Sequence, residues 1–135
     1  MDEEKKEEIS ALLKKGARSL REAEELLKLS MWEGTSSRAY YGAFHTVKAL
    51  LLFKDLTFSK HKSVIGSFNK EFVHTGIFSK DLSQGMEVLF NDRQSGDYDP
   101  MPSITSEKAF YDLRTAYLIH NTIKEWLEKE IESKK

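Results

Sequence analysis

The chain has 135 residues, with 21 Lys and Arg against 22 Asp and Glu, a formal net charge of −1, and no cysteine. The absence of cysteine excludes disulfides, thiolate zinc sites, iron–sulfur clusters and a cysteine nucleophile, and it fits a reducing compartment. The near-zero net charge excludes the uniformly basic surface of general nucleic-acid binders, although a local basic patch is compatible with it. The length is that of one ordinary domain, so we expect a single domain over residues 1–135.

Several broad classes of protein lack their signature in this sequence. The start of the chain is densely charged, and no apolar run approaches the roughly 20 residues of a membrane span. The sequence contains no GxGxxG, GxxxxGK[ST] or GxSxG motif, which argues against dinucleotide-binding, P-loop and α/β-hydrolase folds. We therefore expect a cytoplasmic protein without a membrane segment and without a cofactor.

Apolar residues at three- and four-residue steps predict helices in the first half of the chain. The first expected helix covers residues 3–30 and presents one apolar stripe. After a break around Trp32, the hydroxyl of Thr35 or Ser36 is expected to cap a second helix. The second helix is apolar over a wider arc than the first, so we expect it to be the most buried.

Two shorter helices are expected next. Residues 59–72 carry one apolar stripe and precede a turn-like His-Thr-Gly sequence. The following helix begins near Ser79, whose hydroxyl is suited to cap it, and it ends before Gly96. A polar loop is expected from residue 91 to residue 103.

The only prolines, Pro100 and Pro102, place the strongest helix break just before the last helix, which begins near Ser103 or Thr105. No segment alternates with a period of two, so the helices must bury their stripes against one another. The expected fold is all-α, an up-and-down antiparallel bundle of four to five helices. The expected stripe of the last helix contains Phe110, Leu113, Ala116, Tyr117, His120, Ile123, Trp126, Leu127 and Ile131.

The segment 91–100 concentrates charged and aromatic residues at the end of the fourth helix. Arg93 is suited to bind a phosphate through two hydrogen bonds, and the nearby carboxylates are suited to orient a ligand or the arginine itself. A purely structural alternative is that Arg93 pairs with Asp97 one helical turn later while Tyr98 packs over the helix end.

A second candidate group lies near the start of the second helix. Arg38, Tyr41 and His45 follow one another at steps of three and four, so a cation, a phenol and an imidazole share one helix face. Such a row is suited to bind a polyanion. The structural alternative is that Tyr40 and Phe44 belong to the core and the other three merely flank it.

Four histidines are present, and no pair has the spacing of a metal site such as HExxH, so no metal is expected. His61 lies between Lys60 and Lys62 at an expected helix start, where an anion is suited to bind. The alternative for His61 is an ordinary solvated helix start.

Four sequence motifs in the chain together resemble those of small prokaryotic HEPN-domain proteins, in the branch with an RAYYAxFH-like helix and an RxxxDY-like ending. The resemblance spans roughly residues 10–130. The four motifs are 37–45 (SRAYYGAFH), 60–65 (KHKSVI), Phe72 with Gly76, and 93–98 (RQSGDY).

The resemblance implies a helical bundle that forms dimers and is often encoded beside a minimal nucleotidyltransferase, as a toxin–antitoxin-like pair. Many HEPN proteins are metal-independent ribonucleases that use an Arg followed four to six residues later by His. Arg93 matches that arginine, but Tyr98, Asp99 and Pro100 occupy the places where the histidine is expected. A tyrosine that titrates near pH 10 is a poor substitute for histidine in acid–base catalysis. His45 or His61 is the alternative source of an imidazole.

In some of these pairs the nucleotidyltransferase adds nucleotides to a tyrosine near the motif, a role that the resemblance offers for Tyr98. The leading hypothesis is a dimeric HEPN module that binds nucleotide, RNA or a minimal nucleotidyltransferase. The alternatives are a metal-independent endoribonuclease, with Arg93 as the best catalytic candidate, and a non-catalytic scaffold. The predicted binding residues are Arg38, Tyr41, His45, His61, Arg93, Asp97 and Tyr98.

Overall fold

Helices make up all the regular secondary structure in residues 1–134, which are the residues that the computed structural model describes. The fold class is therefore all-α, as predicted. No helix in this part of the chain combines the length and the apolar character needed to cross a membrane. The elements are α1 (Glu3–Lys28), α2 (Trp32–Phe53), α3 (His61–Phe68), the π-helical turn η1 (Asn69–Val73), α4 (Lys80–Tyr98) and α5 (Ser106–Ser133).

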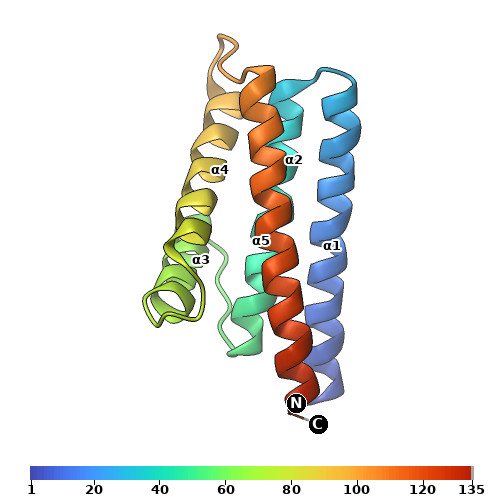
Figure 1. The fold of residues 1–135 in the computed structure, drawn as a ribbon, viewed down its shortest axis with the longest axis vertical. Helices are drawn as coiled ribbons and strands as arrows, with labels where there is room; N and C mark the ends of the chain where they lie inside the picture. The colour runs from blue at the N-terminus through green and yellow to red at the C-terminus, as the bar shows by residue number, and fades with distance from the viewer. Residues whose placement is uncertain (135) are drawn as a thin grey trace.

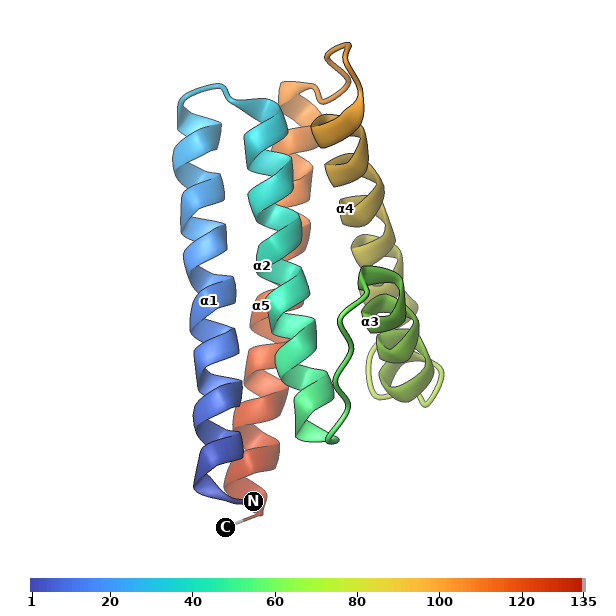
Figure 2. The same cartoon turned by 180° about the vertical axis from the view of Figure 1, so that it is seen from behind.

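The long helices α1, α2 and α5 lie side by side, and α4 runs along the opposite side of the bundle from α1 (Figures 1 and 2). The short helix α3 packs near the beginning of α4, and the two chain ends lie at the same end of the bundle (Figure 1). α2 contacts α1, α5, α4 and α3. Twelve of its 22 residues are buried, which confirms that the second helix is the most enclosed.

The packing of α1 on α2 depends on two glycines that face each other. A Cβ atom on Gly16 would lie 2.8 Å from the carbonyl oxygen of Gly42 and 2.7 Å from Oγ1 of Thr46. A Cβ atom on Gly42 would lie 2.5 Å from the side chain of Leu20. These distances are shorter than non-bonded atoms tolerate, so the two helices approach this closely only because both positions lack a side chain.

The start of α2 differs from the prediction. The helix begins at Trp32 after Met31, so Thr35 and Ser36 lie inside it and do not cap it. Thr35 Oγ1 donates a hydrogen bond to the carbonyl of Met31 (2.9 Å), and Ser36 Oγ donates to Asp112 on α5 (2.8 Å). Both hydroxyls are buried and are used for tertiary or local bonds, which a capping pattern in the sequence does not reveal.

The predicted third helix is divided into α3 and the π-helical turn η1, and the fourth helix is longer than predicted. Ser79 precedes α4 but makes no side-chain capping bond. α4 continues through Gly96 to Tyr98, so the first eight residues of the predicted loop are helical. A Cβ atom on Gly96 would lie 3.3 Å from Ile104. The glycine therefore permits close packing inside the helix and does not end it.

The last helix begins as predicted, because Thr105 Oγ1 accepts a hydrogen bond from the backbone N–H of Lys108 (3.1 Å). The prediction that Phe110 belongs to the buried stripe is wrong, since this side chain is 49% exposed. The core-facing row instead passes through Ala109, Leu113 and Ala116, which leaves Phe110 just outside it.

We predict that Gly16→Ala lowers the free energy of unfolding by about 1–3 kcal/mol, because the new methyl group meets a backbone carbonyl that cannot move aside. The measurement is the midpoint of urea unfolding followed by circular dichroism. Gly66→Ala is the matched control: nothing lies within 4 Å of its Cβ position. Since alanine favours helix, this control should gain up to about 1 kcal/mol. Equal effects of the two substitutions would contradict this account of the packing.

Candidate functional site

Arg93 on α4 is an arginine buried against aromatic rings. The residue is only 7% exposed, and its guanidinium carbon lies 5.1 Å from the ring centre of Tyr40 and 5.6 Å from those of Tyr41 and Phe90. Nη1 lies 3.7 Å from Oδ2 of Asp97, one helical turn later. Nε has no hydrogen-bond partner among the described residues. The arginine is therefore held mainly by ring faces, with part of its hydrogen-bonding capacity unused.

His61, the first residue of α3, packs onto the same group of rings. Its imidazole stacks on Phe44 at 4.3 Å between ring centres, and its Nδ1 lies 2.6 Å from the hydroxyl of Tyr40. Burial raises the pKa of Tyr40 and the charge of Arg93 opposes this rise, so the hydroxyl keeps its proton. Burial, and then the charges of Arg93 and Lys48, lower the pKa of His61. A neutral His61 therefore lies beside a buried guanidinium.

Tyr41 lies between two arginines. Its ring centre is 5.4 Å from the guanidinium of Arg38 on α2 and 5.6 Å from that of Arg93 on α4. Tyr41 is only partly buried, unlike its neighbour Tyr40. A partly buried ring whose centre lies within 5.6 Å of both guanidinium carbons joins the two groups of residues that the sequence predicted separately.

His45 extends this group along α2. Its ring lies 6.1 Å from that of Tyr41 at an interplanar angle of 30°, and its buried Nδ1 has no hydrogen-bond partner among the described residues. Burial lowers the pKa of His45 to about 4, and the charges of Lys15, Lys48 and Arg38 act in the same direction. Cations on both α1 and α2 therefore contribute a positive electrostatic potential at His45.

One cluster contains six of the seven predicted binding residues. They are Arg38, Tyr41, His45, His61, Arg93 and Asp97. The seventh, Tyr98, is 73% exposed and lies outside the cluster, so the alternative in which it packs over the helix end is wrong. Two structural alternatives hold in part: Arg93 does pair with Asp97, and Tyr40 and Phe44 are core residues. His61 is not a simple solvated helix start, because its ring is stacked.

A carboxyl group that the sequence did not predict as part of the site joins three helices beside the cluster. Asp112 on α5 is buried, accepts the hydrogen bond of Ser36 on α2, and shares a hydrogen bond with Asp92 on α4. Burial, followed by the hydrogen bond to Asp92, raises the pKa of Asp112 well above its usual range. The signal in the sequence was a carboxylate placed inside the apolar stripe of the last helix, next to Leu113.

The shared proton makes stability depend on pH. A carboxyl whose pKa is raised by folding contributes stability that is fully present below its ordinary pKa of about 4 and is lost as the pH rises through its folded value. Since folding raises the pKa of Asp112 to about 8, we predict that the wild type loses stability between about pH 4 and about pH 8. Asp112→Asn should lose less, because an amide can make both hydrogen bonds without ionising. Thermal melts across this range test it.

Glu87→Gln on the exposed side of α4 is the control for the pH series, since it makes the same chemical change without burial. The control should follow the wild type. If Asp112→Asn also followed the wild type over the whole range, the shared proton would be disproved.

The comparisons with known proteins agree with the fold and the motifs. The model of the HEPN domain matches residues 9–126. A Methanocaldococcus jannaschii protein named "Putative toxin MJ0142" is 35% identical over 122 residues, which cover 90% of this chain and 83% of the relative. A UPF0332 protein of Thermotoga maritima is 35% identical over 125 residues, covering 92% of this chain and 84% of the relative.

The crystal structure of TT1696 from Thermus thermophilus has the same fold. Its TM-score is 0.73 at 19% sequence identity, and the match covers 87% of this chain and 96% of that chain. The family model spans most of the sequence, and the matched range includes all four sequence motifs. The chain therefore belongs to the HEPN domain family.

Proposed function

We propose that this HEPN domain is a cytoplasmic RNA-binding module in which Arg93 contacts a phosphate. The observation that carries the proposal is the environment of the Arg93 guanidinium, which is buried against Tyr40 and Tyr41 while its Nε has no partner among the described residues. A guanidinium fixed in this way presents its planar donors with little loss of conformational entropy. The partly exposed ring of Tyr41 is suited to stack on a base.

The electrostatics of the cluster support an anionic ligand. Burial is the main cause of the lowered pKa values of His45 and His61, and nearby cations lower them further, with Lys48 acting on both, Arg38 on His45 and Arg93 on His61. Several cations therefore surround the two imidazoles. A protein that needed Arg93 only as a structural ion pair would be expected to place a carboxylate in close contact with it. The 3.7 Å separation from Asp97 is a weaker arrangement that leaves the arginine available to a phosphate.

A second candidate function is metal-independent RNA cleavage, and the position of His61 favours it. In this mechanism Nδ1–H of His61 donates to the hydroxyl oxygen of Tyr40, which leaves Nε2 unprotonated and suited to accept the proton of a ribose 2′-hydroxyl. The neutral state of His61 fits a general base, and Arg93 in the same cluster is suited to stabilise the phosphorane. In this mechanism His61 takes the role of the histidine that is missing after Arg93.

Dimerisation is part of the proposal. Val88 on α4 and Phe110, Tyr111 and Leu118 on α5 are large apolar side chains that remain exposed. Val88 and Tyr111 line one surface depression with Asp92 and Asp112, so an apolar surface adjoins the carboxyl pair. We propose that a second copy of the chain covers this α4–α5 surface, because apolar groups on adjacent helices favour association.

A minimal nucleotidyltransferase is the proposed protein partner, in keeping with relatives that are named toxins. Tyr98 is the proposed target of such an enzyme. Its side chain is 73% exposed at the last residue of α4, which provides the access that nucleotide transfer to its hydroxyl requires. A modified Tyr98 would add negative charge near Arg93 and compete with RNA.

We predict that Arg93→Ala weakens binding of a labelled single-stranded RNA about 10- to 100-fold, because one charge-assisted contact contributes about 1.5–3 kcal/mol. Arg93→Lys should recover part of this loss, since it keeps the charge but not the planar fork. Fluorescence anisotropy gives the affinities, and thermal melts establish that each variant is folded. Lys80→Ala, which removes an exposed cation at the first residue of α4, is the control.

Equal affinity of folded Arg93→Ala and wild type would disprove the phosphate contact. The same RNA, incubated in chelator and resolved on a denaturing gel, separates binding from cleavage. His61→Ala should abolish cleavage while RNA remains bound if the second candidate holds. Intact RNA after incubation with concentrated wild type would leave binding as the function.

We predict that the wild type is a dimer in solution and that Tyr111→Glu with Leu118→Glu makes it a monomer, because two charges would be buried without partners in the apolar interface. Light scattering coupled to size-exclusion chromatography measures the mass. Leu29→Glu is the control, since Leu29 is an exposed apolar residue just after α1. A dimer that survives the double substitution would place the interface elsewhere.

A further inference from the structure

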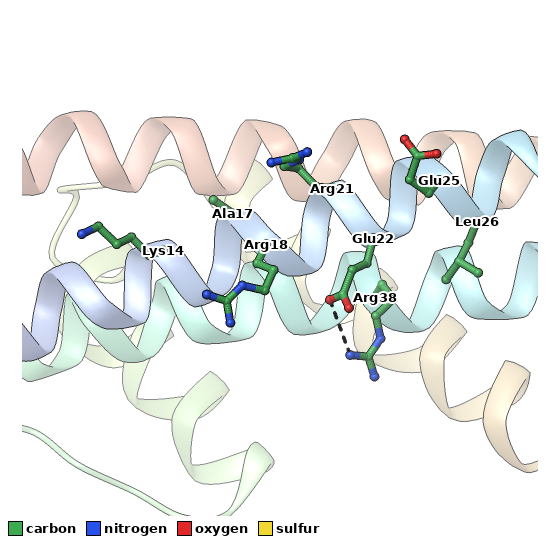
Figure 3. Close-up of a pocket in the computed structure, with 8 residues that line it drawn as sticks. All are labelled: Lys14, Ala17, Arg18, Arg21, Glu22, Glu25, Leu26 and Arg38. Atoms are coloured by element: carbon green, nitrogen blue, oxygen red, sulfur yellow. Dashed lines mark ion pairs between the residues drawn. The ribbon is translucent and has the colours of Figure 1, made fainter.

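A groove of about 770 Å³ runs along the outer face of α1 and onto the first turns of α2 (Figure 3). It lies on the opposite side of α2 from Arg93's helix α4 (Figure 2). Four of its lining residues are cations and two are carboxylates. The lining consists of Lys14, Ala17, Arg18, Arg21, Glu22, Glu25, Leu26 and Arg38.

The cations of this groove are largely free to take a ligand. Lys14 and Arg18 are exposed, follow one another by one helical turn, and make no ion pair among the described residues. Glu22 reaches Arg38 at 4.0 Å, with both side chains about half exposed. Such a long, solvated ion pair contributes little and is easily exchanged for another anion. Arg18 lies on the same side of α1 as the Glu22–Arg38 pair but its guanidinium turns away from the pair, and Arg21 lies on the other side of the helix (Figure 3).

Arg38 connects this groove with the Arg93 cluster. It lines the groove and also lies 5.4 Å from the ring centre of Tyr41, whose other cation is Arg93. Beyond the larger effect of burial, the charges of Lys15 on α1 and Lys48 on α2 both lower the pKa of His45, so cations of both helices act at this place. A strand that leaves the Arg93 cluster past Tyr41 meets Arg38 first and the groove next.

We infer that the α1–α2 groove binds the sugar–phosphate backbone of the RNA segment flanking the Arg93 cluster, with Lys14 and Arg18 as its phosphate contacts. This inference rests on the proposed RNA binding and extends it by a second subsite. Two cations one turn apart on a helix are separated by about 6 Å along its axis, a spacing suited to successive phosphates of an extended strand. The apolar lining residues Ala17 and Leu26 give the sugars a surface to pack on.

RNA fits this groove better than an acidic protein surface does. Basic grooves that continue into aromatic side chains are the arrangement by which proteins bind single strands, because the cations follow the backbone while the rings stack on bases. Tyr41 and His45 supply such rings beside Arg38, where the groove reaches α2. An acidic helix could pair with the cations of the groove, but it has no bases to stack on the neighbouring rings.

The test compares a short and a long RNA. A four-nucleotide RNA is long enough to occupy only the Arg93 cluster, whereas a twelve-nucleotide RNA also reaches the groove. We predict that Lys14→Ala with Arg18→Ala removes most of the affinity that the longer RNA gains, about tenfold or more, while the short RNA is affected about threefold or less. For the longer RNA, the slope of log affinity against log salt concentration should decrease in magnitude by about 1.4, because each of the two lost phosphate contacts contributes about 0.7.

Lys70→Ala with Lys80→Ala is the matched control, because it removes the same charge from η1 and α4, away from the groove. Arg38 is left unchanged because it contacts both sites. If the Lys14/Arg18 variant kept the full gain with length, or if polyglutamate bound the wild type as tightly as the longer RNA did, the groove would not be an RNA subsite. A further outcome is that Arg93→Ala weakens binding of both RNAs while the Lys14/Arg18 variant keeps the full increase in affinity with RNA length. That result would overturn the inference and leave the proposed function standing.

Discussion

The close approach of α1 and α2 at Gly16 and Gly42 determines how the Arg93 cluster and the α1–α2 groove are arranged. Thr46, one turn after Gly42, donates its hydroxyl proton to the Gly42 carbonyl (2.8 Å) and lies 2.6 Å from Nδ1 of His120 on α5. Since the hydroxyl has only one proton, Nδ1–H of His120 is the donor in the second bond. The three long helices therefore meet at one point. The same contact sets Lys14 and Arg18 of α1 beside the face of α2 that carries Arg38.

Ring faces take the place that carboxylates usually take around buried arginines. Arg93 is surrounded by Tyr40, Tyr41 and Phe90, and its one carboxylate partner among the described residues, Asp97, is 3.7 Å away. Cation–π contacts of this kind are worth about 0.5–2 kcal/mol each, enough to orient a guanidinium without neutralising it. The positive charge therefore remains available to an anion. The nearby carboxyl pair opposes this less than two carboxylates would, because burial and the hydrogen bond to Asp92 raise the pKa of Asp112 and favour its protonated form.

The sequence predicted most of the fold and much of the candidate site, and its errors have physical causes. Five amphipathic segments became helices, and the spacing of Arg38, Tyr41 and His45 predicted their common face, since both follow from helical periodicity alone. The limits of α2 and α4 were wrong because Ser36 and Gly96 serve tertiary contacts, although their residue types suggest a cap and a stop. The meeting of Arg93 with Tyr40 and His61, and the Asp92–Asp112 pair, depends on how separate helices pack, which periodicity cannot specify.

The most direct test of the central claim observes the Arg93 guanidinium itself. Nuclear magnetic resonance of ¹⁵N-labelled protein detects each arginine Nε–H group, and Arg114, exposed on α5, provides an internal reference in the same spectrum. We expect the Arg93 Nε–H signal to shift as a single-stranded RNA is added, with the same midpoint as overall binding, because a phosphate bound by the guanidinium changes the surroundings of its Nε–H group. An Arg93 signal that stays in place while the protein becomes saturated with RNA, or a protein that binds no RNA, would contradict the account.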